Sequence, residues 1–256
     1  MNDSCNQTLQ NHVSAQPRYG IDAPGFIQGF FLVGISAFLA GFFIPSFNLF
    51  GIHVAFLGSL LCFTALIPLA LGTSMAIYGL RGKFNIRDLM LNMIAWRGDE
   101  QVLDVGTGRG LLAIGAAKCL SSGKAIGIDI WRAQDLSGNT MENTLRNVAL
   151  EGMQGKVELK KEDIRSTSFA DQSFDVILSL LCLHNIEDEK ERDVACHEIA
   201  RILKPGGTVL IADYIPTGGY AKALAAAGLA VKSSKSHLRA AYALMWIVTA
   251  TKEGNL

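Results

Sequence analysis

Charge is missing from one long part of this 256-residue chain. No Asp, Glu, Lys or Arg occurs from Ala23 to Leu80, and 43 of the 46 charged residues follow Leu80. The whole chain is 50% hydrophobic and only 18% charged, which excludes a disordered chain and a uniformly soluble protein. We therefore expect a short membrane anchor followed by one domain of about 175 residues.

Net charge and paired cysteines are also lacking. Lys plus Arg and Asp plus Glu both number 23, so neither a global field nor a basic stripe favours a nucleic-acid partner. The five cysteines are odd in number and irregularly spaced, with no Cys-x-x-Cys pair. This pattern argues against a disulfide framework and a zinc site and favours a reducing compartment. No metal site is predicted.

Two long apolar runs fill the uncharged region, at residues 26–44 and 52–78, with a turn-forming cluster at residues 45–48 between them. A helix of about 20 residues spans the hydrocarbon core of a bilayer, and neither run has a polar face. The sequence therefore predicts a transmembrane helical hairpin over residues 26–80. The alternatives are a buried soluble helix pair and a signal peptide, but the first 25 residues lack the basic start of a signal peptide.

Cations follow the second apolar run and are absent from the loop between the runs. Arg81, Lys83 and Arg87 come directly after it. The positive-inside rule then places both the C-terminal domain, residues 81–256, and the N-terminal tail, residues 1–25, in the cytoplasm. Small residues in the runs offer faces for helix packing within the hairpin or for a homo-oligomer.

A glycine-rich loop follows the first strand expected in the C-terminal domain. Gln101–Val105 has strand composition, residues 111–120 have helix composition, and Gly106-Thr107-Gly108-Arg109-Gly110 lies between them. A strand, a glycine turn and a helix in this order form a ligand-binding loop of an α/β sheet. The spacing is not that of a dinucleotide fingerprint, because Leu111 stands where the third glycine is needed. Asp104, before the loop, suits the ammonium of an amino acid better than a pyrophosphate.

With Asp104 in front of it, this loop resembles the first motif of the class I S-adenosylmethionine-dependent methyltransferases, D/E-x-G-x-G-x-G. Four further segments match that family in order. They are a strand at residues 124–130 that ends with Asp129, Asp163 after a strand at 157–161, Asp175 in a strand at 174–179, and a turn, Leu203-Lys204-Pro205-Gly206-Gly207, between a helix at 189–202 and a strand at 208–212. The strands expected through residue 251 suit a Rossmann-like α/β fold. We expect a seven-stranded, mostly parallel sheet with flanking helices, preceded by two transmembrane helices.

The resemblance implies S-adenosyl-L-methionine as cofactor and S-adenosyl-L-homocysteine as product. It also implies which residues contact the cofactor: Asp104, Gly106, Thr107, Gly108 and Gly110 in the loop, Asp129 at the ribose, Ile130 and Trp131 beside the adenine, Asp163 and Ile164 at the adenine ring, and Ser179 near the methyl group. Core packing is an equal alternative for Trp131.

Few bases lie near the expected reactive end of the cofactor. Residues 181–186 follow the fourth strand, at the sheet edge where open α/β sheets bind ligands. His184 is the candidate base or substrate hydrogen-bonding group, with Asn185 beside it. Tyr214, which follows Asp213 at the end of the fifth strand, is a second candidate for contact with the substrate. A structural His184 that only orders its loop is the alternative.

A polar insert at residues 134–139 follows the expected ribose-binding position. It covers the cofactor or lines the acceptor pocket; the alternative is a solvated helix start with Ser137 or Asn139 as N-cap.

Together these features predict an integral-membrane S-adenosylmethionine-dependent methyltransferase. Its domain looks most like the ubiquinone/menaquinone C-methyltransferase-like group. A membrane anchor favours a hydrophobic or membrane-associated small-molecule acceptor, because confinement raises the effective concentration of that acceptor. Two alternatives remain: a methyltransferase for a small polar amine or thiol, whose helices serve as a lid or in oligomerisation, and a non-catalytic module that binds S-adenosylmethionine. The acceptor atom is left open.

Overall fold

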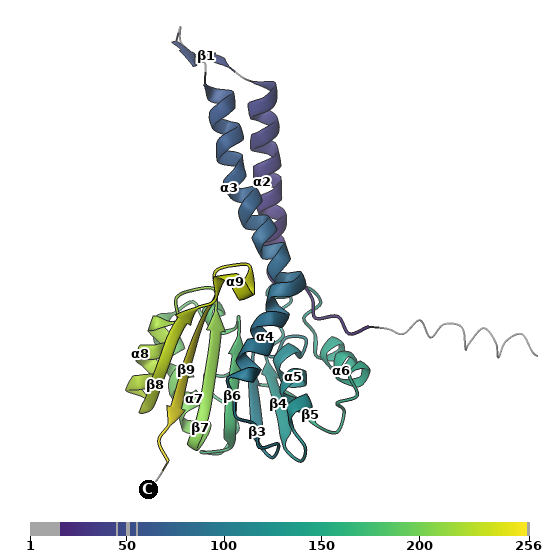
Figure 1. Ribbon diagram of the computed structural model, residues 1–256, viewed down its shortest axis with the longest axis vertical. Helices are drawn as coiled ribbons and strands as arrows, with labels where there is room; N and C mark the ends of the chain where they lie inside the picture. The colour runs from purple at the N-terminus through teal and green to yellow at the C-terminus, as the bar shows by residue number, and fades with distance from the viewer. Residues whose placement is uncertain (1–15, 45, 50–51, 55, 255–256) are drawn as a thin grey trace, which may run out of the picture.

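The computed structural model describes residues 16–44, 46–49, 52–54 and 56–254. A helical hairpin projects from one end of an α/β domain (Figure 1). Most of the predicted N-terminal tail and residue 45 of the predicted turn lie outside the described residues.

The hairpin consists of α2 (Pro24–Phe43) and α3 (Leu57–Ile77), joined by the antiparallel strands β1 (Phe47–Leu49) and β2 (Ile52–Val54). By length and composition, two helical stretches of the described chain are apolar enough to cross a membrane, and only about a tenth of each apolar window is buried. The prediction that the second run is helical from residue 52 is wrong at its start, where β-branched residues form β2 instead.

Small residues bring the two helices of the hairpin together. The buried residues of these helices are Gly34 and Gly41 on α2 and Gly58, Ala65 and Gly72 on α3. A Cβ atom on Gly34 would lie 2.6 Å from Cγ of Leu69, and one on Gly41 would lie 2.5 Å from the carbonyl oxygen of Gly58. These glycines therefore pack inside the hairpin, so they give no support to the predicted homo-oligomer.

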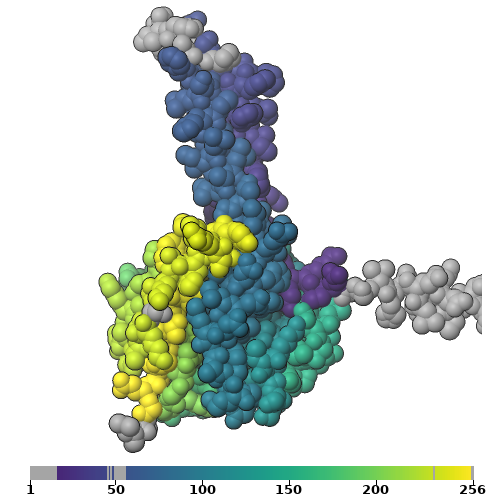
Figure 2. All heavy atoms as spheres, viewed as in Figure 1, coloured from purple at the N-terminus to yellow at the C-terminus, as the bar shows by residue number. Residues whose placement is uncertain are grey.

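The helix α3 runs without a break into the domain. It continues through a π-helix, η1 (Tyr78–Gly82), into α4 (Lys83–Asn92). Gly82 packs directly on the backbone of Ala241, in a short helix that the sequence did not predict, α9 (Leu238–Ala241). Figure 2 shows this yellow C-terminal segment seated on the blue base of the hairpin.

The α/β domain has the expected Rossmann-like sheet with flanking helices. Seven strands form it in the order β5-β4-β3-β6-β7-β9-β8, and β9 is antiparallel to both of its neighbours. The strands are β3 (Gln101–Val105), β4 (Lys124–Asp129), β5 (Val157–Lys161), β6 (Phe174–Leu180), β7 (Leu203–Asp213), β8 (Leu229–Ser236) and β9 (Trp246–Lys252). The Lys-Pro-Gly-Gly segment, expected as a turn, is the start of β7, where the pairing with β6 is irregular between Phe174 and Val176.

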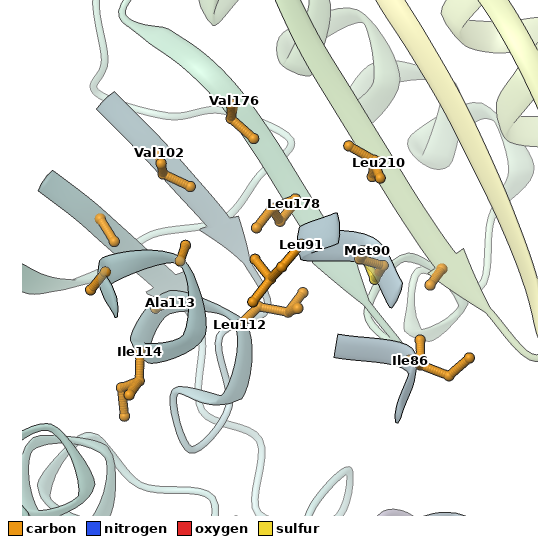
Figure 3. Close-up of a cluster of buried hydrophobic side chains, with 14 of the residues drawn as sticks. Ile86, Met90, Leu91, Val102, Leu112, Ala113, Ile114, Val176, Leu178 and Leu210 are labelled. Carbon is orange, nitrogen blue, oxygen red and sulfur yellow. The ribbon is translucent and has the colours of Figure 1, made fainter. Parts of the chain in front are cut away.

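Helices cover both faces of the sheet. They are α5 (Leu111–Cys119), α6 (Met141–Leu150), α7 (Glu189–Ile202) and α8 (Gly218–Ala226), and the short η2 (Leu183–Asn185) follows β6. Buried side chains of α4 and α5 share one core cluster with one sheet face, and those of α7 and α8 share another with the opposite face. In Figure 3, Ile86, Met90 and Leu91 of α4 lie with Leu112 beside the strands that carry Val102 and Leu178. This packing fixes the base of the hairpin to the sheet.

Residues 16–23, which we call the N-terminal strap, run along the domain before α2 begins. The amide of Ile21 donates to Oγ of Ser137 at 2.8 Å, and the amide of Ala23 donates to the carbonyl of Asp135 at 3.1 Å. In Figure 2 the purple strap lies against the teal part of the domain. The insert at 134–139 is therefore covered by the strap, and the capping alternative is wrong, because Thr140 is the N-cap of α6.

Candidate cofactor and acceptor site

A cavity of about 430 Å³ lies at the carboxyl ends of β3, β4, β5 and β6. One wall comes from the sheet and the loops after these strands, as predicted for an open α/β sheet. The other wall comes from the N-terminal strap and the base of the hairpin, which contribute Tyr19, Asp22, Tyr78 and Lys83. The cavity thus lies between the domain and the segments that flank the apolar helices.

The glycine loop needs glycine at three positions. Gly106, Gly108 and Gly110 have φ angles of 72°, 53° and 85°, in the left-handed region that other residues rarely adopt. A side chain on Gly106 would overlap that of Cys182. Gly106, Thr107 and Gly108 line the cavity as predicted, whereas Gly110 lies outside the lining and precedes α5 as its N-cap.

The carboxylate of Asp104 holds the glycine loop against α5. Its Oδ2 accepts hydrogen bonds from Oγ1 of Thr107 at 2.8 Å and from the amide of Ala113 at 2.9 Å. Burial raises the pKa of Asp104 to about 7. Asp104 also lines the cavity. Contact between its carboxylate and the ammonium of the cofactor therefore stays a prediction, in addition to the hydrogen bonds that hold the loop.

The carboxylate of Asp129 lies where the ribose was expected. Its Oδ2 accepts from the amide of Gly108 at 2.8 Å, and its Oδ1 accepts from the amide of Trp131 at 2.6 Å. Each carboxylate oxygen has two acceptor positions, so both oxygens retain one for a ribose hydroxyl. Ile130 lines the cavity, but the indole of Trp131 lies outside the lining and donates to the carbonyl of Gly108 at 3.3 Å.

The adenine side of the predicted site includes Asp163 and Ile164, and both line the cavity. The guanidinium of Arg165 donates to both carboxylate oxygens of Asp163, at 2.5 to 3.1 Å, and lowers its pKa. Ser179 is completely buried, and its Oγ donates to the carbonyl of Val105 at 3.1 Å. The structure therefore places Ser179 in the sheet and outside the lining of the cavity.

His184 forms a pair with a buried carboxylate. Its Nδ1 lies 2.8 Å from Oδ1 of Asp213, which has no exposed surface. Asp213 also accepts from the hydroxyl of Tyr220 at 3.0 Å and from the amide of Tyr214 at 2.8 Å. The contact at Nδ1 holds the imidazole ring of His184 against Asp213. A histidine held in this way can serve as a base, but His184 itself lies outside the lining of the cavity, next to Asn185.

The other two catalytic candidates are placed differently. Asn185 lines the cavity. The ring of Tyr214 is half exposed and packs edge-to-face on His184, with 4.6 Å between the ring centroids, but it is outside the lining.

Sequence reasoning missed the hairpin side of the site. Lys83 was taken as a cation flanking the membrane, but its side chain is buried, and its amine donates to the carbonyls of Tyr19 and Gly20 and lies 3.5 Å from Oδ2 of Asp22. The signal for this contact was the position of Asp22 and Lys83 near opposite ends of the uncharged stretch, because a helical hairpin brings its two ends together.

Some polar side-chain atoms in the cavity wall make no hydrogen bond within the protein. Among the described residues, four buried side-chain polar atoms have no hydrogen-bond partner: Oδ2 of Asp22, the hydroxyl of Tyr78, Nε of Arg109 and Oδ1 of Asn139. All four residues line this cavity. Because buried polar groups are nearly always paired, the cavity suits a polar ligand. Arg109 belongs to the glycine loop and Asn139 lies beside Gly108 of that loop, so these residues fit a cofactor of the predicted kind.

Comparison with known proteins gives the following matches. The family model described as a methyltransferase domain matches residues 103–211. The demethylmenaquinone methyltransferase of Bacteroides fragilis is 37% identical over 112 residues, which are 44% of this chain and 42% of that protein. The ubiquinone/menaquinone biosynthesis C-methyltransferase of Geotalea daltonii is 32% identical over 129 residues, which are 50% of this chain and 51% of that protein. The chain thus spans about half the length of these curated relatives.

Among solved structures, that of the [4+2]-cyclase SpnF is similar with a TM-score of 0.55 and 20% identity, over 67% of this chain and 82% of that chain. A likeness at this identity shows the fold alone. The name of that protein also illustrates that one fold can host different reactions, so the reaction has to be argued from the site.

Removal of the Asp129 carboxylate should weaken cofactor binding. We expect Asp129→Ala to raise the Kd for S-adenosylmethionine about 5- to 150-fold, or about 1–3 kcal/mol, because charge-assisted hydrogen bonds to the ribose are lost. Isothermal titration calorimetry measures this change. Asp193→Ala, at an exposed position of α7, is the control and should bind normally. An unchanged Kd for Asp129→Ala would contradict the placement of the ribose.

The raised pKa of Asp104 should appear in the pH dependence of stability. A carboxyl whose pKa rises from 3.8 to about 7 on folding stabilises the folded state fully below about pH 4, and this contribution is lost as the pH rises to about 7. Without cofactor, we expect wild type to lose up to about 4 kcal/mol of unfolding free energy relative to Asp104→Asn over this range.

Urea unfolding of the detergent-solubilised protein between pH 4.5 and 8 tests the prediction for Asp104. The exposed variant Asp193→Asn should keep the wild-type pH dependence. Parallel curves for wild type and Asp104→Asn would show that the carboxyl of Asp104 ionises normally.

The match of residues 103–211 to the methyltransferase domain, together with the sheet order and the glycine loop, supports an S-adenosylmethionine-dependent methyltransferase domain with S-adenosylmethionine as its cofactor.

Proposed function

We propose that this chain is an integral-membrane methyltransferase that transfers a methyl group from S-adenosylmethionine to a hydrophobic or membrane-associated small molecule. In this proposal residues 26–80 cross the bilayer as a hairpin, and residues 81–256 form the catalytic domain in the cytoplasm. The acceptor reaches the cavity from the membrane side.

One observation carries the proposal: the base of the apolar hairpin and the cofactor loop line the same cavity. Tyr78, which directly follows α3, and Asp22, just before α2, share this lining with Gly108 and Asp129. A simple tether would not require the residues that flank the helix pair to line this cavity. An acceptor dissolved in the bilayer meets this wall where the helices leave the membrane.

The surface of the hairpin supports a membrane setting. Large apolar side chains are exposed along both helices, and among the most exposed are Phe26, Leu32, Phe42 and Phe43 on α2 and Phe63 on α3, each 67–73% exposed. Soluble monomers rarely expose such a continuous apolar surface, whereas a bilayer covers it. The exposure also argues against the alternative of a buried soluble helix pair.

The names of the relatives support a hydrophobic acceptor. One relative is named for demethylmenaquinone, and the other for ubiquinone and menaquinone biosynthesis. We therefore propose a quinone-like or other lipid-soluble acceptor for this chain too.

The chemistry divides between cofactor and protein. The bound cofactor supplies a methyl group on a positively charged sulfur, so the protein has mainly to align the acceptor and exclude water. Leu112, Leu181 and Ile186 form an apolar part of the cavity wall. In this proposal His184, which is held by Asp213 and adjoins the lining residue Asn185, takes the proton that the acceptor loses.

Labelling of natural acceptors tests the proposed function. Purified full-length protein in nanodiscs is incubated with methyl-labelled S-adenosylmethionine and with separate lipid and aqueous extracts, and products are identified by mass spectrometry. We expect label in a molecule of the lipid extract. Label only in polar amines or thiols would contradict the proposal, and cofactor binding with no labelled product from either extract would favour the non-catalytic module.

The role of His184 can be separated from a structural one. With methyl-labelled S-adenosylmethionine and the lipid extract as substrates, we expect His184→Asn and Asp213→Asn to lower the turnover rate about 10²- to 10⁴-fold, because proton transfer in the transition state is lost. The Kd for S-adenosylmethionine should not change. His197→Asn, on the exposed side of α7, is the matched control. Normal turnover by both site variants would mean that this pair only orders its loop.

A further inference from the structure

Two of the four polar atoms without a hydrogen bond in the cavity wall lie on the hairpin side. One is Oδ2 of Asp22, from the N-terminal strap, which forms an ion pair with Lys83 at 3.5 Å, and the other is the hydroxyl of Tyr78, from η1. The side chain of Tyr78 is only 5% exposed, so solvent does not supply the hydrogen bond that its hydroxyl lacks. Since a buried polar atom without a partner destabilises a fold, these two atoms call for a ligand group.

The structure holds both groups firmly. Lys83, five residues after Tyr78, donates to the carbonyl of Tyr19 at 2.9 Å and to that of Gly20, and lies 3.5 Å from Oδ2 of Asp22. The amine of Lys83 and the carboxylate of Asp22 thus form an ion pair. Tyr78 belongs to the π-helical turn η1, and π-helical turns frequently occur at functional sites.

The chemistry of the two atoms selects a kind of ligand. An ionised carboxylate only accepts hydrogen bonds, whereas a tyrosine hydroxyl can donate one. A ligand hydroxyl satisfies both, because it donates to one partner and accepts from the other. An ammonium group fits less well, because it would approach the buried ammonium of Lys83 and be repelled. Leu111, Leu112 and Leu181 in the same wall suit an apolar body.

We propose that Asp22 and Tyr78 form the binding site for a hydroxyl group of an apolar acceptor. The hydroxyl donates a hydrogen bond to Oδ2 of Asp22 and accepts one from the hydroxyl of Tyr78. This inference rests on the proposed function, and it names the recognition chemistry of the acceptor. It also assigns a role to residues outside the matched domain, at the two ends of the hairpin.

Three probes of nearly equal apolar size test this site: 4-nonylphenol, its methyl ether and nonylbenzene. Their affinities for the full-length protein in nanodiscs, with S-adenosylhomocysteine present, are measured by ligand-observed NMR. The phenol can pair with both residues, the ether only with Tyr78, and the hydrocarbon with neither. We expect wild type to bind the phenol at least tenfold more tightly than the hydrocarbon, with the ether between them.

Each variant should change a different ratio of affinities. Tyr78→Phe should lower the affinity for phenol and ether together, about five- to tenfold relative to the hydrocarbon. Asp22→Asn should reduce the preference for phenol over ether about tenfold. The matched controls Tyr242→Phe and Asp88→Asn, both exposed near the hairpin base and outside the cavity, should keep wild-type ratios. An unchanged Kd for S-adenosylhomocysteine shows that the variants fold.

Equal affinity of wild type for the three probes would overturn the site, as would wild-type ratios in a folded Tyr78→Phe variant. These results are separable from failure of the proposed function. A labelled lipid product without a hydroxyl in its precursor, combined with no probe preference, would overturn the site alone. A hydroxyl preference without any labelled lipid product would support the site and contradict the proposed function.

Discussion

The buried amine of Lys83 is the interaction on which the arrangement of hairpin, strap and cavity depends. Burying a charge is costly unless it is paired and hydrogen-bonded. The amine of Lys83 donates to two strap carbonyls and forms an ion pair with the Asp22 carboxylate. Lys83 begins α4, whose buried face packs on the sheet. One side chain therefore links the segment before the hairpin to the helix after it, and the wall they form stands opposite the cofactor loop.

Local patterns predicted much of the fold. The bounds of β3, β5 and α7 follow from apolar periodicity and from the acidic start of α7 after its N-cap Asp188. Elements that depend on distant partners were not predictable. The helix α9 lies against Gly82 from across the chain, and the strap is held by residues more than a hundred positions away. Such partners are too far apart in the sequence for a local pattern to predict their contact.

The candidate site shows the same division. The positions of Asp129 and of the loop glycines could be predicted, because a carboxylate at a strand end and glycines at positive φ angles are recognisable in the sequence. Trp131 and Ser179 lie outside the cavity lining. Trp131 has a φ of 50° and its indole donates to the carbonyl of Gly108 in the glycine loop. Ser179 lies within the buried part of β6. Lys83 contacts Tyr19 across 64 positions, and only the closure of the hairpin brings them together.

The unbroken helix from α3 into α4 has an energetic consequence for a lipid substrate. Extracting an alkyl chain from a bilayer into water costs roughly 0.8 kcal/mol for each methylene group, so a long tail would add a barrier of ten kcal/mol or more, on the order of the chemical step itself. In the proposed setting the helix holds the mouth of the cavity at the headgroup layer. A substrate then turns only its polar end into the protein while its tail stays in hydrocarbon, and the desorption barrier disappears from the reaction.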